Sequence, residues 1–216
     1  MSSRTLPRNG YLHQAPVLHI ANRLMLPVIA RMLDRYYQTQ TDRRIFEVGC
    51  GTGASASWLH DHGFDVTGVD PSPTGIALAH EHFPHLKLHS GSGYDDLAAQ
   101  YGQFPCVLTM EVIEHVYDPR LFVARLFDLV LPGGIVIVTT PFHGYWKNLA
   151  LALTGRMDAH FTALWAHGHI KFWSPVTLST LLSETGFAAI RIHRVGRIPA
   201  LARSMIAFAN RPASMA

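Results

Sequence analysis

Hydrophobic positions along the chain follow two patterns, one typical of helices and one typical of buried strands. Between Pro16 and Tyr37 they return at roughly helical spacing, which predicts one or two helices ahead of the core. After that, short runs rich in β-branched and aromatic residues alternate with helical segments. These runs are Arg44–Val48, Asp65–Val69, Leu86–His89, Cys106–Met110 and Gly134–Thr139, followed by Ala189–Val195 and Ser204–Ala209.

Strands and helices in alternation predict an α/β fold. Parallel strands need crossover connections, which are usually helices, so we expect a mostly parallel sheet with helices on both faces. Two helix starts can be recognised directly, because Asp118 precedes Pro119 and Ser174 precedes Pro175. Each pair combines an N-cap acceptor with a proline at the first helical position. The last two runs are expected to complete the sheet.

The composition is that of a globular domain, with 48% hydrophobic and 15% charged residues among 216. We expect residues 1–216 to form a single domain that carries a helical segment at 11–40 and a lid-like insertion at 141–173. The formal net charge is only +3. Because binding to duplex nucleic acid depends on many phosphate contacts, no such partner is expected.

Several features favour a cytoplasmic location. Two cysteines, Cys50 and Cys106, do not make a disulfide framework, which is typical of a reducing compartment. Residues Met1–Gly10 lack the apolar segment of a secretory signal. The apolar stretch Leu24–Leu33 is short and contains a proline and an arginine, whereas a spanning helix needs ~20 apolar residues.

A glycine-rich turn is expected where the first strand leads into the next helix. Residues Glu47–Gly53 read E-V-G-C-G-T-G, and this is the place where open α/β sheets bind nucleotide-like ligands. The spacing G-x-G-x-G differs from the G-x-G-x-x-G of pyrophosphate-binding folds. Asp70 follows at the end of the second run, where a carboxylate can accept hydrogen bonds from ribose hydroxyls. Together the turn and the acid predict a ligand that contains a nucleoside.

With these motifs the chain resembles the class I methyltransferases that use S-adenosylmethionine (SAM). The match consists of the glycine turn, V-T-G-V-D-P-S at 66–72 and L-P-G-G at 131–134. The resemblance implies a Rossmann-like, seven-stranded, mostly parallel sheet whose last strand is antiparallel. The cofactor-binding residues that it implies are Glu47, Gly49, Cys50, Gly51, Gly53, Asp70, Pro71, Ser92, Gly93 and Met110. Many members place an aspartate against adenine, but this chain has Gly91–Tyr94 there, so Ser92 or a backbone group is left for that contact.

An acidic and histidine cluster follows the fourth run as E-V-I-E-H. Glu111, Glu114 and His115 stand at i, i+3 and i+4, so we expect them to converge on one face of a helical turn. The methyl group must be delivered close to this strand end, which makes Glu111 and His115 the candidate catalytic residues, with a general base among them.

With this E-x-x-E-H cluster the chain resembles one group within that class, the ubiquinone-biosynthesis O-methyltransferases. In that group the E-x-x-E-H motif is associated with a divalent metal. Small-RNA 2′-O-methyltransferases have a similar cluster with one further histidine, for which His169 is the candidate here. The set Glu111, Glu114, His115 and His169 suits Mg, Mn or Fe better than a structural zinc, which favours cysteine. The alternative is the metal-free arrangement of many SAM methyltransferases, in which the histidine holds a loop.

The insertion at 141–173 contains many aromatic residues, among them Tyr145, Trp146 and Trp165. One interpretation is a lid that packs on the domain. The other is an apolar pocket wall, or a peripheral membrane contact through an amphipathic helix at Trp146–Leu153. Both favour a hydrophobic or aromatic acceptor.

The sequence therefore predicts a SAM-dependent methyltransferase for a small acceptor, with a phenol or quinol hydroxyl as the first choice. Methylation of an RNA terminal ribose is the alternative among enzymes, and the modest charge weighs against it. A catalytically silent SAM-fold partner protein is the alternative outside enzymes. The intact glycine turn, Asp70 and E-V-I-E-H weigh against that alternative.

Overall fold

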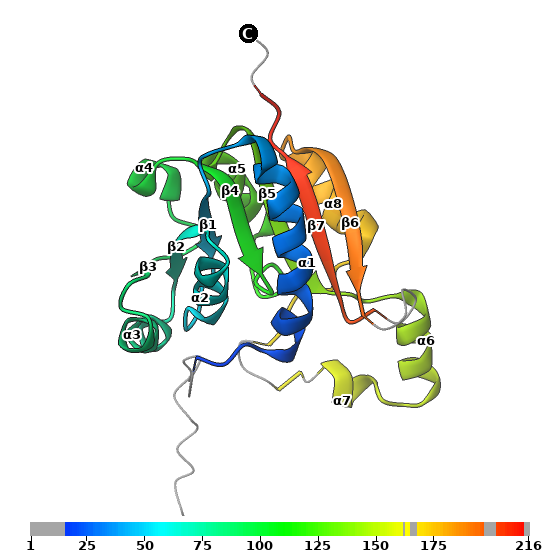
Figure 1. Ribbon diagram of the computed structural model, residues 1–216. Coiled ribbons are helices and arrows are strands. Elements are labelled where there is room, and N and C mark those ends of the chain that lie inside the picture. The colour runs from blue at the N-terminus through cyan, green and yellow to red at the C-terminus, as the bar shows by residue number, and fades with distance from the viewer. Residues whose placement is uncertain (1–15, 162, 165–167, 197–201, 214–216) are drawn as a thin grey trace, which may run out of the picture.

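The computed structural model describes residues 16–161, 163–164, 168–196 and 202–213. Met1–Gly10, the first part of the 11–40 segment and Trp165 lie outside the described residues. The described chain contains a seven-stranded sheet with the order β3-β2-β1-β4-β5-β7-β6 (Figure 1). Its strands are β1 Arg44–Val48, β2 Asp65–Asp70, β3 Lys87–Ser90, β4 Phe104–Met110, β5 Val130–Pro141, β6 Ala188–Val195 and β7 Ser204–Asn210.

The strand directions confirm the expected topology. Strands β3, β2, β1, β4 and β5 pair in parallel, whereas β7 is antiparallel to both β5 and β6. Every residue of β4 is buried, because helices cover both faces of this central strand. The carboxyl ends of β1, β2 and β4 therefore meet at one edge of the sheet, and ligands of open α/β sheets bind at such an edge.

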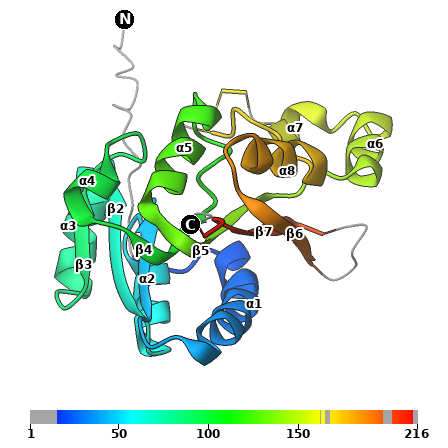
Figure 2. The same ribbon diagram turned by 90° about the horizontal axis from the view of Figure 1, so that it is seen from above.

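Helices lie on both faces of the sheet, as the views in Figures 1 and 2 show. One face packs against α1 Ile20–Tyr36, α2 Ala54–Asp61 and α3 Pro73–His82. The other packs against α4 Leu97–Tyr101, α5 Pro119–Leu129 and α8 Pro175–Glu184. The predicted N-caps are confirmed, since the Asp118 side chain accepts from the backbone of α5 and the Ser174 side chain from that of α8.

The apolar pattern before the first strand forms a single helix, α1, which continues into the short 3-10 helix η1 Tyr37–Thr39. Pro27 lies inside α1, and a proline there has no N–H for the helical hydrogen bond. The helix continues because its inner side is fully buried, with Met25, Leu26, Ile29 and Leu33 packed against the sheet.

The insertion contains two helices that stand apart from the two layers. These are α6 Tyr145–Leu153 and α7 Met157–Phe161, and neither contains a buried residue. In Figure 1 they lie at the lower right, beyond the edge toward which β4 points. They are therefore on the same side of the molecule as the glycine turn.

Candidate active site

The glycine turn connects β1 to α2 and is held against β2. The backbone N–H groups of Gly49 and Cys50 both donate to the carbonyl oxygen of Val69, at 2.8 and 3.0 Å. Gly49 has φ +87°, and a Cβ atom there would lie 2.3 Å from the Val112 side chain. Glycine is needed at this position both for its backbone conformation and for the close approach of Val112.

Asp70, at the end of β2, stabilises the glycine turn through hydrogen bonds to its carboxylate. One carboxylate oxygen accepts from Gly51 N at 2.9 Å, and the other accepts from Ser72 N at 2.8 Å. Each carboxylate oxygen has lone pairs for more than one donor, so both remain able to accept from a ligand. Asp70 thus shapes the turn and offers acceptors to the cavity that the turn borders.

Glu47 lies beneath the turn and is completely buried. Its Oε1 accepts a 2.5 Å hydrogen bond from the hydroxyl of Ser55 in α2, so the pair joins the strand and the helix on either side of the turn. No other described group bonds its second oxygen. Burial raises the Glu47 pKa to about 7, and the negative charge of Asp70 adds to this shift.

A cavity of about 450 Å³ opens between the glycine turn, the end of β2 and the loop after β4. Seven of the ten predicted cofactor residues line it, namely Gly49, Gly51, Asp70, Pro71, Ser92, Gly93 and Met110. Glu47, Cys50 and Gly53 do not, because Glu47 and Cys50 are buried below the turn and Gly53 caps α2. Sequence reasoning missed the lining residues Val48, Tyr94, Val112, Val116, Tyr117 and Phe122.

The apolar wall of this cavity is formed by residues whose hydrophobic sequence pattern is the same as that of core residues. Phe122 belongs to the buried face of α5, and a Cβ atom on Gly93 would lie 2.4 Å from its ring. Tyr94 is fixed by its hydroxyl, which accepts from Asp118 N at 2.9 Å. The contact between Gly93 and Phe122 joins distant parts of the sequence, so the sequence alone does not indicate that Phe122 lines the cavity.

The E-V-I-E-H segment forms a turn and not the predicted helical face. Glu111 has φ +55°, a left-handed conformation, and its N–H donates to Thr139 in the neighbouring strand β5. A short turn closed by a hydrogen bond from His115 N to Val112 O follows. The expected helical turn does not begin at Glu111, because the left-handed backbone of this residue is incompatible with a right-handed helix and directs its N–H to β5.

The two acids of this turn bond to adjacent threonines on β5. Thr139 donates to Glu111 Oε1 at 2.9 Å, and Thr140 donates to Glu114 Oε2 at 3.1 Å. Burial raises the pKa of Glu111 to about 7. It also raises the pKa of Glu114 well above its usual range, and repulsion from Glu111 contributes to that shift.

His115 lines the cavity, and its ring is oriented by the insertion. Its Nδ1 is 3.1 Å from the carbonyl oxygen of Gly168, which can only accept, so Nδ1 carries the proton in this bond. In the neutral imidazole the other nitrogen, Nε2, then has a lone pair.

His169 lies beside His115, with a ring-centroid distance of 4.9 Å. Its Nε2 is 3.9 Å from Glu114 Oε1, an oxygen that is buried and has no hydrogen-bond donor in the described chain. One ligand atom from each of Glu114, His115 and His169 lies within 4.8 Å of the others, and Glu111 is outside this group. A carboxylate and two imidazoles are a donor set that suits a divalent transition metal.

The ends of the insertion are bonded to the core of the site. Ile170 N and Lys171 N both donate to the Glu114 carbonyl oxygen, at 2.9 and 3.0 Å, and the Trp173 ring donates to Ile113 O at 3.2 Å. At the other end, Phe142 N donates to Arg203 O at 2.8 Å. Both ends of the insertion are therefore fixed.

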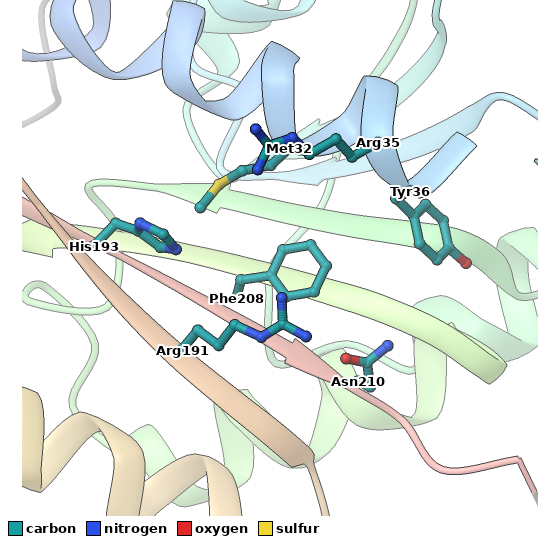
Figure 3. Close-up of a pocket in the computed structure, with 7 residues that line it drawn as sticks. All are labelled: Met32, Arg35, Tyr36, Arg191, His193, Phe208 and Asn210. Atoms are coloured by element: carbon teal, nitrogen blue, oxygen red, sulfur yellow. The ribbon is translucent and has the colours of Figure 1, made fainter. Parts of the chain in front are cut away.

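A further cavity of about 350 Å³ lies elsewhere, between α1 and the strands β6 and β7. Figure 3 shows Met32, Arg35 and Tyr36 projecting from α1 toward Arg191, His193, Phe208 and Asn210 of the strands. None of these residues comes from the turns after β1, β2 or β4. We name this cavity the α1 groove and do not assign the cofactor to it.

Comparison with known proteins agrees with this arrangement. The family profile described as "Methyltransferase domain" matches residues 17–192. The chain is 32% identical to a ubiquinone biosynthesis O-methyltransferase of Azorhizobium caulinodans, over 79% of this chain and 71% of that protein. It is also 32% identical to the protein of that name from Cereibacter sphaeroides, over 66% of this chain but only 59% of that protein.

Solved structures share the fold at low sequence identity. The crystal structure of the CurJ carbon methyltransferase superposes with a TM-score of 0.66 at 18% identity, covering 89% of this chain and 57% of that one. This likeness concerns the fold alone.

Proposed function

Because the chain belongs to the methyltransferase-domain family of SAM-dependent enzymes, we propose that it methylates a hydroxyl group on a small aromatic or otherwise apolar acceptor, such as a phenol or quinol. The observation that carries this proposal is the position of His115. Its side chain lines the large cavity, and the bond to Gly168 O places the proton of the neutral ring on Nδ1, which makes Nε2 the basic nitrogen. The matched relatives are named as O-methyltransferases of ubiquinone biosynthesis, which supports a phenolic acceptor.

In this proposal SAM occupies the cavity of about 450 Å³, a size within the ~300–1,000 Å³ of small-molecule sites. The backbone of Gly49 and Gly51 lies against the amino-acid part of the cofactor, and Asp70 accepts from the ribose hydroxyls. Ser92 and Gly93 border the adenine. Glu47 acts from below by holding the turn through Ser55.

The reaction proposed is a single displacement at the methyl carbon. The acceptor oxygen forms a bond to that carbon while the carbon–sulfur bond breaks, and the electron pair remains on sulfur to give S-adenosylhomocysteine. In the absence of a bound cation, the hydroxyl proton passes to Nε2 of His115 and later to water. The protein contributes orientation of the two reactants and proton removal.

We also propose that Glu114, His115 and His169 hold a divalent cation. The buried Oε1 of Glu114, which has no hydrogen-bond donor among the described residues, supports this, because an unpaired polar atom in the interior is costly and a cation relieves the cost. A bound cation would lower the pKa of the acceptor hydroxyl. With the cation bound, Nε2 of His115 would be a ligand and the hydroxyl proton would pass to water, whereas in the metal-free alternative Nε2 is the base. In both cases Glu111 supports the turn through Thr139 and is not a ligand.

We further propose that the insertion at 141–173 contacts a bilayer or an apolar acceptor. Tyr145 and Trp146 on α6 are 72% and 62% exposed, and Leu153 at its end is 79% exposed. Exposed aromatic and aliphatic residues on a short helix are typical of interfacial contacts. No helix in the described part of the chain is long and apolar enough to cross a membrane. Residues 1–216 are proposed to act as one domain.

The two alternative functions considered from the sequence, methylation of an RNA terminal ribose and a catalytically silent partner protein, gain no support. The matched relatives are named for ubiquinone biosynthesis and not for RNA modification. A silent partner protein would have no need for a cavity bordered by an intact glycine turn, Asp70 and His115.

Mass spectrometry of products formed with labelled SAM and a panel of catechols, quinols and small RNAs tests the proposal. His115→Gln, which cannot accept the proton, should lower kcat by about 10²–10⁴-fold. His193→Gln in the α1 groove is the matched control and should retain wild-type turnover. Calorimetry with S-adenosylhomocysteine establishes that the cofactor site is intact in each variant. Wild-type turnover by His115→Gln would remove the base from the mechanism.

A further inference from the structure

The α1 groove has an arginine on each of its two walls. Arg35 comes from α1 and Arg191 from β6, as Figure 3 shows. No acidic residue is among the described residues that line the groove. Neither arginine forms an ion pair within the part of the chain that the structure describes. Because a guanidinium group is always charged, two positive charges border this groove without a described counter-charge.

Regular secondary structure brings the lining side chains together. On α1, Met32, Arg35 and Tyr36 stand at i, i+3 and i+4, so they share one face of the helix. Arg191 of β6 is paired directly with Phe208 of β7, and paired residues of antiparallel strands point to the same face of the sheet. The Arg191 guanidinium carbon is 6.0 Å from the centre of the Phe208 ring. A helix and two strands therefore hold the walls of the groove in place.

Apolar and aromatic side chains form much of the remaining wall. Met32, Tyr36 and Phe208 are each partly buried in it. The Tyr36 hydroxyl donates to the carbonyl oxygen of Pro105 at 3.1 Å, which fixes its ring. Asn210 adds a side-chain amide that can both donate and accept hydrogen bonds. These groups suit a flat ring with heteroatoms on its edge.

Neither a metal cation nor a bare anion matches the whole groove. The two guanidinium groups would repel a cation, including the sulfonium of SAM. Free phosphate would leave the aromatic wall uncovered. The volume of about 350 Å³ is at the lower end of the ~300–1,000 Å³ of small-molecule sites, so it admits one ring system with an anionic group. The groove shares no lining residue with the cofactor cavity and is a separate site.

We propose that the α1 groove is a second ligand site, which binds a nucleoside monophosphate. Arg35 and Arg191 bind the phosphate, whose charge of about −1.5 to −2 at pH 7 balances theirs. The base stacks against the Phe208 and Tyr36 rings, and Asn210 bonds to its edge. This inference does not depend on the identity of the methyl acceptor.

Methionine methyl groups allow both sites to be followed in one NMR spectrum. Met32 lines the α1 groove, Met110 lines the cofactor cavity, and Met25 is fully buried in α1. The protein is labelled with [methyl-¹³C]methionine, and the three signals are assigned with Met32→Leu, Met110→Leu and Met25→Leu. Adenosine 5′-monophosphate (AMP) is then titrated in the presence of saturating S-adenosylhomocysteine. Adenosine, which lacks the phosphate, and ribose 5-phosphate, which lacks the base, are the matched ligands.

AMP should shift the Met32 signal in a saturable way and leave the signals of Met110 and Met25 in place. Adenosine should bind at least about tenfold more weakly, because the charge-assisted hydrogen bonds to the phosphate are absent. Ribose 5-phosphate should bind at least about fivefold more weakly, because the stacking of the base is absent.

Variants of the two arginines test the phosphate contact. Arg35→Met and Arg191→Met should each weaken AMP binding about tenfold, the lower end for a charged partner, because solvent screens exposed side chains. Arg120→Met is the matched control and should keep the wild-type affinity, since Arg120 is exposed on the other face of the sheet and pairs with Glu184 at 3.0 Å. A normal shift of the Met110 signal on addition of S-adenosylhomocysteine establishes that each variant is folded.

Three outcomes would overturn the inference. The first is a Met32 signal that AMP leaves unchanged, including the case in which only Met110 responds. The second is binding of adenosine or ribose 5-phosphate as tight as that of AMP. The third is an AMP affinity that both Arg35→Met and Arg191→Met leave at the wild-type value. None of these measurements involves turnover, so their failure and a failure of the proposed methyl transfer are distinguishable.

Discussion

Replacing Asp70 with alanine probes both the cofactor contact and the architecture of the turn. In the folded chain the carboxylate already accepts from Gly51 N and Ser72 N, at 2.9 and 2.8 Å. The substitution therefore removes acceptors for the ribose and also releases two backbone N–H groups. A simple loss of SAM affinity would not distinguish these two effects.

The magnitude of the ribose effect follows from the charge on the acceptor. Hydrogen bonds to a charged group contribute ~1.5–3 kcal/mol, which corresponds to about 10- to 150-fold in Kd. Loosening of the Gly49–Gly53 turn would weaken every ligand of the cavity to a similar degree, whether or not it carries a ribose hydroxyl. Asp70→Asn should show a smaller loss, because its amide oxygen can still accept from one backbone N–H.

A comparison of S-adenosylhomocysteine with its 2′-deoxy analogue separates the two effects by calorimetry. Asp70→Ala should weaken the parent compound by about 10- to 150-fold, but the deoxy analogue by clearly less. Asp65→Ala, which removes an exposed carboxylate paired with Lys87, is the control and should leave both affinities unchanged. Equal losses for both ligands would mean that Asp70 acts only through the turn. Unchanged binding of the parent compound would refute the placement of the cofactor.

Three further perturbations address the lid, the metal and a buried acid. Tyr145→Ala combined with Trp146→Ala should raise the acceptor KM or reduce flotation with vesicles, and no change in either would make the insertion ordinary packing. Exhaustive chelation, verified by metal analysis, should abolish turnover until Mn, Mg or Fe is restored, whereas full activity of the metal-free protein would leave His115 as a plain base. Burial raises the Glu47 pKa from 4.5 to about 7, so the folded chain retains a proton that the unfolded chain releases, and stability falls as pH rises through that window. Glu47→Gln should remove this part of the slope and be more stable at pH 8 by about 3 kcal/mol in urea denaturation, while parallel pH profiles would contradict the assignment.

Much of the fold was predictable because its signals are local. The run Arg44–Val48 coincides with β1, and the caps at Asp118 and Ser174 begin their helices as expected. A glycine turn and an acid after successive parallel strands must meet at one edge of a sheet, so Asp70 was predictable as a neighbour of the turn.

The features that were not predictable depend on contacts between distant segments. Glu111 adopts a left-handed backbone because Thr139, 28 residues later in the chain, takes its N–H. Phe122 lines the cavity although its position in the sequence pattern is that of a core residue. Its ring contributes to the cavity wall because Gly93, which has no side chain, lies directly against it. Cys50 lies within the motif but faces the core, because successive positions of a turn point in different directions.

The two fixed ends of the insertion have a consequence for how this protein could diversify. The Glu114 carbonyl and Trp173 secure one end, and the bond from Phe142 to Arg203 secures the other. Extending a loop between two anchored ends costs little, since doubling its length adds only about 0.6 kcal/mol of closure entropy. New segments can therefore be exchanged between these anchors while the glycine turn and Asp70 stay in register. The segment between the two anchors is therefore replaceable. Evolution or a protein engineer could change it, and with it the range of acceptors, without altering the cofactor site.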